Sequence, residues 1–162
     1  MRLQHFIDAL EEFSAVHGVS VFRTPLRPWV VGRMHESQIV LRSGLSKEQQ
    51  LLTLVHELTH FLAHRPEQHL NRTVCEYEAE AVEKLVAGQL GLKDSGTAID
   101  LGNVTDDLLA CSVARVRWVA RTLLTAVQDK KFEAHIAEDR YRRRPPSRSR
   151  QRPVKKSFSM MN

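Results

Sequence analysis

The sequence predicts an α+β domain that is mainly helical and contains one small sheet. Three features of the sequence lead to this prediction. Apolar residues recur at helical spacing in four stretches, short β-branched runs lie between the first two of these, and Gly or Pro residues separate the elements. A chain of 162 residues, 42% of them hydrophobic, is long enough to form one domain with its own core.

The N-terminal part of the chain predicts one helix and three strands. Apolar residues at helical spacing predict a helix over residues 2–16. Residues 19–23 alternate and are rich in β-branched side chains, which favours a short strand. Residues 29–32 and 37–42 predict two further strands, with a turn near residues 34–36 between them. Together the three strands would form the small sheet.

A second helix is predicted over about residues 47–64. Ser46 and Gln49 have the spacing of a capping box, in which each side chain bonds the backbone N–H of the other residue at a helix start. The apolar run of this helix begins at Leu51, and Pro66 disfavours helix at the residue before it. The helix therefore has a defined start and end.

This helix carries the motif His-Glu-x-x-His. Four residues advance about 400° along an α-helix, so His56 and His60 project from one face, one turn apart. Two imidazoles so placed can bind one zinc ion, and Glu57, about 100° around the helix, can reach a water on the metal without being a ligand. We therefore predict one zinc ion per chain, with Glu57 as the catalytic base. The alternative is a chance match, which would leave two imidazoles without partners beside an apolar face.

A catalytic zinc site usually has three protein ligands, and the helix predicted next, over residues 73–90, offers several carboxylates. Glu76 and Glu80 are four residues apart and share a face of that helix. One of them would bind zinc, and the other would accept the free N–H of a ligating imidazole. Alternatively, Glu76 closes a capping box and the other carboxylates lie in solvent. His64 and His69 do not have the spacing of a further ligand, and we expect them at the surface or in a substrate groove.

These motifs together resemble the ImmA/IrrE family of metallo-endopeptidases, whose pattern is HExxH followed by a helix carrying E-x-E-A-x-x-x-A. The resemblance covers about residues 19–92 and rests on His56-Glu57-Leu58-Thr59-His60 and Glu76-x-Glu78-Ala79-Glu80. The combination of Ala-Glu in the second helix, the ending Gly91-Leu92 and a further helix is also similar to the zincin domain of ArdC-type antirestriction proteins. The resemblance implies a minimal zincin-like (gluzincin) fold, with Glu76 as the third zinc ligand and Glu80 as the residue that supports the ligands.

The function implied by the resemblance is zinc-dependent hydrolysis of peptide bonds in a protein substrate, such as a transcriptional regulator. The strand at residues 37–42 would border the substrate groove, so that a peptide pairs with it as an added strand. A hypothesis of another class is a non-catalytic zinc protein of the antirestriction or phage type, which binds nucleic acid or a partner protein. Loss of activity without loss of zinc in a Glu57 variant would distinguish the two.

The C-terminal third predicts one long helix that begins near residue 105, after turn-like residues 93–104. Its apolar positions are nearly heptad-spaced: Leu109, Val113, Val116, Ala120, Leu123, Leu124 and Val127. We expect this stripe to pack in the core against the HExxH helix, and a dimer seam is the alternative. The folded domain is predicted to span residues 1–139.

The remaining segment is strongly basic. Residues 140–162 contain nine Lys or Arg and no Asp or Glu, whereas the other 139 residues contain fifteen Lys or Arg against nineteen Asp or Glu. Pro, Ser and cations replace apolar residues, so we predict a disordered tail. Its cations could neutralise phosphates of nucleic acid without reading sequence: Arg142, Arg143, Arg144, Arg148, Arg150, Arg152, Lys155 and Lys156. The alternative is a tail that only adds solubility.

The sequence contains no apolar run of about 18 residues, so no membrane span is predicted. The N-terminus does not have the pattern of a signal peptide. The two cysteines, Cys75 and Cys111, fall in predicted helices and are expected to be reduced. We therefore expect a cytoplasmic protein.

Overall fold

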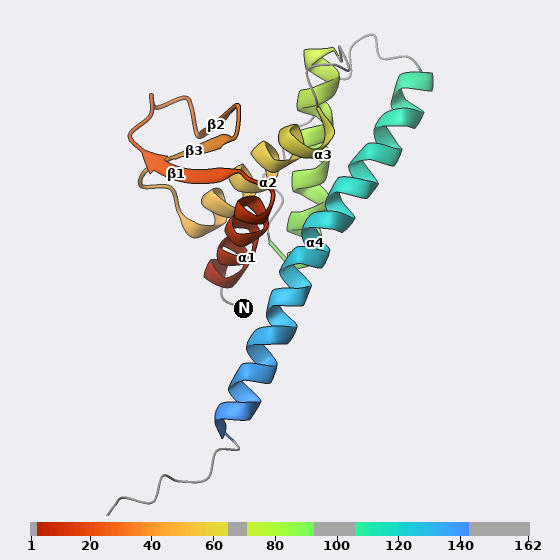
Figure 1. Ribbon diagram of the computed structural model, residues 1–162. Helices are drawn as coiled ribbons and strands as arrows, with labels where there is room; N and C mark the ends of the chain where they lie inside the picture. Colours follow the sequence, from red (N-terminus) through yellow and green to blue (C-terminus); the bar gives the residue numbers. More distant parts are fainter. Residues whose placement is uncertain (1–2, 65–70, 93–105, 143–162) are drawn as a thin grey trace, which may run out of the picture.

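The computed structural model describes residues 3–64, 71–92 and 106–142, and in the last segment it describes the side chains of residues 111–129. In chain order the elements are α1 (Leu3–Val16), β1 (Ser20–Thr24), β2 (Gly32–His35), β3 (Gln38–Arg42), α2 (Lys47–Ala63), α3 (Arg72–Leu90) and α4 (Asp106–Arg142) (Figure 1). This arrangement confirms the predicted α+β class and is that of a minimal zincin-like domain. The predicted connections at 66–72 and 93–104 lie largely outside the described residues.

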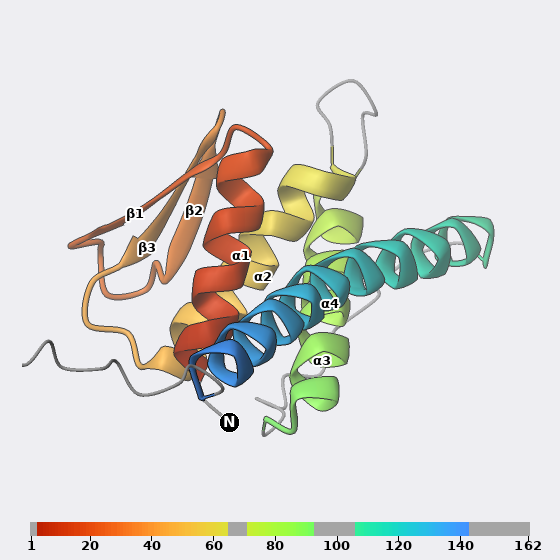
Figure 2. The same cartoon turned by 60° about the horizontal axis from the view of Figure 1, so that its bottom comes forward.

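The helices form two layers on one side of the sheet. α1 and α2 lie next to the strands, and α3 and α4 cover the far side of these two helices (Figure 2). Fully buried side chains from α1, β3, α2 and α4 meet between the layers: Ile7, Leu10, Ile39, Leu41, Leu51, Leu54, Leu58 and Leu123. Burial of apolar surface on both sides of α2 therefore holds the HExxH helix in the middle of the fold.

The sheet has the strand order β1-β3-β2. β3 runs parallel to β1 and antiparallel to β2, so both of its edges are paired. The expectation that a peptide pairs with residues 37–42 is therefore wrong, because that strand has no free edge. β1 and β2 are the two edge strands, and β2 is the one that lies against α2.

β2 begins three residues later than the sequence predicted. The chain turns before it, where the Val30 N–H donates a hydrogen bond of 2.9 Å to the Arg27 carbonyl. After β2, a two-residue turn at residues 36–37 leads into β3, and Glu36 there has a positive φ of 51°. The turn region was predicted, but the strand position depends on pairing with β3, which local sequence does not specify.

The ends of α2 and α3 explain how each helix is placed. At the start of α2, the Gln49 N–H donates to Ser46 Oγ and the Ser46 N–H donates to Gln49 Oε1, which confirms the capping box. At the start of α3, Asn71 is the cap and its side chain accepts from the Thr73 N–H at 2.8 Å. Because Asn71 caps this helix, the alternative role of Glu76 in a capping box does not arise.

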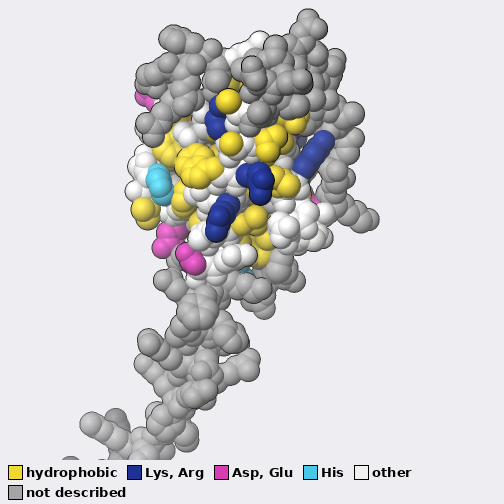
Figure 3. All heavy atoms as spheres, turned by 90° about the vertical axis from the view of Figure 1, so that its right-hand side faces the viewer, with side chains coloured by type: hydrophobic (Ala, Val, Ile, Leu, Met, Phe, Trp, Pro, Cys, Tyr) yellow, Lys and Arg dark blue, Asp and Glu magenta, His cyan; other side chains and the backbone are white. Residues whose placement is uncertain are grey.

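α4 packs against α1, α2 and α3 along most of the predicted stripe. Val116, Ala120, Leu123 and Val127 are buried, so this part of the stripe contributes to the core, as expected, whereas Val113 is exposed and does not. Hydrophobic and basic side chains are interspersed on the side of the molecule that Figure 3 shows.

α4 runs to Arg142, three residues past the predicted domain end, and residues 143–162 of the predicted tail lie outside the described residues.

In the described part of the chain, no helix has the length and apolar character needed to cross a membrane.

Candidate metal centre

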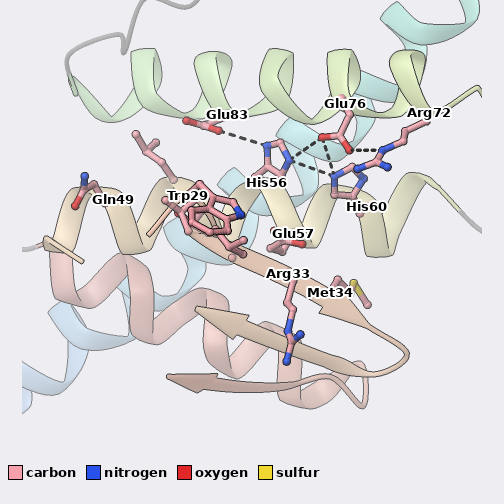
Figure 4. Close-up of a pocket in the computed structure, with 15 residues that line it drawn as sticks. Trp29, Arg33, Met34, Gln49, His56, Glu57, His60, Arg72, Glu76 and Glu83 are labelled. Atoms are coloured by element: carbon pink, nitrogen blue, oxygen red, sulfur yellow. Dashed lines mark hydrogen bonds and ion pairs between the residues drawn. The ribbon is translucent and has the colours of Figure 1, made fainter. Parts of the chain in front are cut away.

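Three side chains predicted as metal ligands converge between α2 and α3 (Figure 4). His56 Nε2 lies 3.2 Å from His60 Nε2. Glu76 Oε2 lies 3.4 Å from His56 Nε2 and 3.7 Å from His60 Nε2. Among the described residues, these are the one group of His, Cys, Asp or Glu side chains whose donor atoms could share an ion.

The triangle of donor atoms has the size that zinc requires. In a tetrahedral site with bonds of about 2.0–2.1 Å, neighbouring ligand atoms are about 3.3–3.4 Å apart. The three distances between the donor atoms, 3.2, 3.4 and 3.7 Å, lie close to this value. Two imidazoles and one carboxylate are also a donor set that suits zinc. The residues present therefore fit a zinc ion, which His56, His60 and Glu76 would hold beside the cleft.

The second oxygen of Glu76 has its own partner. Arg72, four residues earlier on α3, places its Nε 3.7 Å from Glu76 Oε1, while Oε2 faces the two imidazoles (Figure 4). The Arg72 side chain is 92% exposed, so this pair contributes little to stability. The two oxygens of Glu76 thus have different neighbours, Arg72 for Oε1 and the histidines for Oε2.

The two imidazoles have different electrostatic surroundings. Burial, together with the nearby His56, lowers the pKa of His60 to about 4. Burial alone would lower the pKa of His56, but the carboxylates of Glu83, Glu57 and Glu76 outweigh it and raise that pKa above its usual value. His60 is therefore neutral at neutral pH, and a neutral ring has the lone pair that a metal needs.

Glu57 is only 7% exposed, and strand β2 lies directly against it. A Cβ atom at Gly32 would be 3.1 Å from Glu57 Oε1 and 2.3 Å from Thr53 Cγ2, so a glycine is needed at this position. The Met34 backbone N–H donates a hydrogen bond to the Glu57 carboxylate. Burial raises the pKa of Glu57 to about 6, although His56 and the Met34 N–H act in the opposite direction.

The ring nitrogens that face away from the donor triangle have neighbours other than Glu80. His56 Nδ1 lies 3.6 Å from Glu83 Oε2, and His60 Nδ1 lies 2.9 Å from His64 Nδ1. The structure thus places Glu83 and His64 where the sequence suggested Glu80. His64 was expected at the surface or in the groove, but its side chain is 6% exposed. The spacing of four residues between His60 and His64 places the two side chains on one helix face, and this signal could have identified His64 as a neighbour of the His60 ring.

The donor triangle and Glu57 line a cleft of about 780 Å³. Residues 29–34 form one wall, α2 forms the floor, and Arg72, Glu76 and Glu83 of α3 form the other wall. Trp29, which is 75% exposed, adds an apolar surface to the first wall, whereas Arg33 points away from the histidines (Figure 4). The cleft therefore combines apolar contact surface with polar groups at one point, as binding sites for small molecules and peptides do.

A protein-family model described as the IrrE N-terminal-like domain, Peptidase M78, matches residues 15–96. The match covers half of the chain, from the end of α1 to the end of α3, and includes every residue of the donor triangle. Searches of curated proteins and of solved structures returned no match. α4 lies outside the matched residues.

Proposed function

The chain belongs to the family of the IrrE N-terminal-like domain, Peptidase M78, and we propose that it is a zinc-dependent metallo-endopeptidase acting on a protein substrate. One observation carries this proposal: His56, His60 and Glu76 present three donor atoms at tetrahedral spacing beside the buried carboxylate of Glu57. His56, His60 and Glu76 would hold one zinc ion per chain. The family itself supports a metallopeptidase-type function.

In the proposed reaction, the zinc ion and Glu57 would have different roles. Zinc in such a site lowers the pKa of a water molecule towards about 7 and polarises a carbonyl group. Glu57 lines the same cleft and follows His56 directly in the sequence. Its carboxylate accepts a proton from the attacking water and delivers this proton to the leaving amine. In the metal-free site, burial raises the pKa of Glu57, which favours uptake of a proton by this carboxylate.

The free edge of β2 is the proposed binding site for the substrate backbone. The Arg42 N–H donates to the Val31 carbonyl, and bonded residues alternate along an antiparallel pair, so the backbone groups of Gly32 and Met34 face away from β3. Gly32 and Met34 line the cleft together with Glu57, and the Met34 N–H is a backbone partner of the Glu57 carboxylate, which supports this choice of edge. An extended peptide could therefore pair with β2 and pass the donor triangle.

The test is cleavage of unfolded polypeptides. Purified protein with one equivalent of zinc is incubated with a mixture of unfolded proteins, and new N-termini are identified by mass spectrometry. We expect zinc-dependent cleavage that a chelator abolishes and that the Glu57→Gln variant lacks. A protein that binds zinc but generates no new N-termini from this mixture, or from candidate regulators, would support the non-catalytic alternative.

A transcriptional regulator is the proposed class of substrate, and contact with nucleic acid through the basic tail is a separate proposal. The charge of residues 140–162 favours the second proposal. Contact through the tail would bring the protein close to DNA or RNA, and this proposal does not depend on catalysis.

A further inference from the structure

A chain of hydrogen bonds leads from the donor triangle into the protein interior. His60 Nδ1 lies 2.9 Å from His64 Nδ1, and His64 Nε2 lies 2.9 Å from Glu78 Oε2. Glu78 is fully buried. We call His60, His64 and Glu78 the relay. It joins the C-terminal end of α2 to the middle of α3, on the side of His60 opposite to the donor triangle.

Helix α4 fixes the far end of the relay. Ser112 Oγ donates to Glu78 Oε1 at 2.5 Å, and Arg115 Nη2 donates to the same oxygen at 2.5 Å. Arg115 Nε contacts both oxygens, at 3.1 Å and 3.0 Å. Burial would raise the pKa of Glu78, but its bonds from His64, Arg115 and Ser112 lower this pKa to about 2. The relay therefore ends in a carboxylate that can only accept hydrogen bonds.

This end point determines which ring nitrogen carries the proton at each step. Glu78 accepts, so His64 donates from Nε2. In a neutral imidazole one nitrogen is a donor and the other an acceptor, so in the neutral form of His64 its Nδ1 accepts and His60 Nδ1 donates. His60 then has its lone pair on Nε2, which is the atom that faces His56 and Glu76. The order of the three residues leaves the lone pair where a metal would bind.

We propose that His64, backed by Glu78, is a positioning residue that holds His60 in the tautomer with a free Nε2 lone pair. The proposal rests on the proposed function only in so far as His60 is a metal ligand. Ligating histidines are commonly fixed by a carboxylate or a backbone carbonyl at the other ring nitrogen. Here an imidazole occupies that place, and it is fixed in turn by the Glu78 carboxylate, which Arg115 and Ser112 of α4 hold.

A purely structural role for these residues predicts different results. Ser112 and Arg115 already provide Glu78 with donors, and no buried side-chain polar atom among the described residues lacks a partner. If the network only joins helices, its loss would lower stability and leave the tautomer of His60 and the intrinsic affinity for zinc unchanged. Stability, tautomer and affinity must therefore be measured separately.

Two readouts on the full-length chain distinguish these roles. The first is the tautomer of His60 in the metal-free protein, obtained from ¹⁵N chemical shifts of the ring nitrogens. The second is zinc affinity, obtained by competition with a chelator of known affinity. His64→Leu removes the acceptor for His60 Nδ1, so we expect loss of the Nδ1–H tautomer and about 10–100-fold weaker zinc binding. His64→Asn places an amide oxygen near the position of Nδ1, and it should restore the tautomer and most of the affinity.

Glu78→Gln reverses the polarity of the relay. Ser112 Oγ and Arg115 Nη2 donate at 2.5 Å to Oε1, whereas Oε2 faces His64 and receives only Arg115 Nε, at 3.0 Å. The amide oxygen of the introduced glutamine should therefore take the place of Oε1, and its NH₂ group should face His64. His64 would then accept at Nε2 and donate at Nδ1, against the Nδ1–H of His60. We expect His60 to shift to the Nε2–H tautomer, with zinc affinity lowered in proportion to the loss of the Nδ1–H form.

Thr59→Val is the matched control. Thr59 is a fully buried neighbour of His60 on α2, and its hydroxyl donates to the Val55 carbonyl and not to the relay. This variant should lose stability and retain both the tautomer and the affinity. The proposal is overturned if His64→Leu and Glu78→Gln keep the Nδ1–H tautomer of His60 in the folded metal-free protein, or if His64→Asn behaves like His64→Leu. If the wild type binds no zinc, the proposed function fails, but the tautomer measurements still decide this proposal.

Discussion

Gly32 of β2 lies directly against the carboxylate of Glu57. A methyl group at Gly32 would come within 3.1 Å of Glu57 Oε1 and within 2.3 Å of the Thr53 methyl carbon. The edge strand and the proposed catalytic base are thus held at a separation that only glycine allows, and the free edge of β2 faces the same cleft as Glu57.

The first prediction follows from this contact. Gly32→Ala should lower the free energy of unfolding by about 1–3 kcal/mol, as overpacking in a core does. It should also displace β2 or Glu57, and so lower kcat/KM for a peptide substrate while zinc content is retained. Denaturant unfolding, peptide cleavage and metal analysis provide the three measurements.

Two further variants make this test specific. Gly88→Ala adds the same methyl group on α3 where no atom lies within 4 Å, and in a helix it should raise stability by about 0.5–1 kcal/mol. Thr53→Ser removes the methyl carbon that the new Cβ atom would meet, so it should restore part of the stability of Gly32→Ala. If Gly32→Ala behaves like Gly88→Ala, strand and helix are not in the close contact described.

The second prediction concerns the ligands. His60→Ala and Glu76→Gln should each reduce zinc content well below one ion per chain. A chelator should lower the Tm of the wild type but hardly that of these variants, because the ion joins α2 to α3. Metal analysis after purification without chelator and thermal unfolding would check this. Full zinc occupancy in Glu76→Gln would show that another residue is the third ligand.

The third prediction separates Glu83 from Glu80. Glu83 lies 3.6 Å from His56 Nδ1, whereas the structure places no corresponding contact with the ligands at Glu80. Glu83→Gln should therefore weaken zinc binding, by about 10-fold at the lower end of such effects, and Glu80→Gln should change it less. Competition with a chelator gives both affinities. The reverse order would restore the role first suggested for Glu80.

The local parts of this fold and site could be predicted from the sequence. The capping box of Ser46 and Gln49 and the shared face of His56 and His60 depend only on residues within one or two helical turns. The central position of β3 could not be predicted, because strand order is set by contacts between distant segments. For the same reason, the carboxylate that approaches His56 depends on how α3 lies across α2, and sequence spacing alone did not favour Glu83 over Glu80.

The fourth prediction concerns the buried charge pair behind the site. Arg115→Met removes the cation that donates to the fully buried Glu78 carboxylate. Breaking such a pair leaves an uncompensated buried charge, so the free energy of unfolding of the metal-free protein should fall by about 3–5 kcal/mol. Arg117→Met, two residues along the same helix and exposed, should change it by no more than about 0.5 kcal/mol. Equal effects of the two substitutions in urea unfolding would contradict this account.

The last prediction separates an enzyme from a binding protein. Glu57 is not among the three donors of the triangle, so Glu57→Gln should bind zinc and unfold at nearly the wild-type temperature. The amide keeps the size of the side chain and its acceptor for the Met34 N–H, but it cannot take up the proton. Cleavage should therefore fall by about 10²–10⁴-fold, as on loss of a general base. Because the edge of β2 and the zinc ligands are unchanged, the variant should still bind a peptide that the wild type cleaves, which equilibrium binding of a labelled peptide would measure. Loss of zinc from Glu57→Gln would show that this carboxylate is a ligand, and undiminished cleavage would show that another group moves the proton.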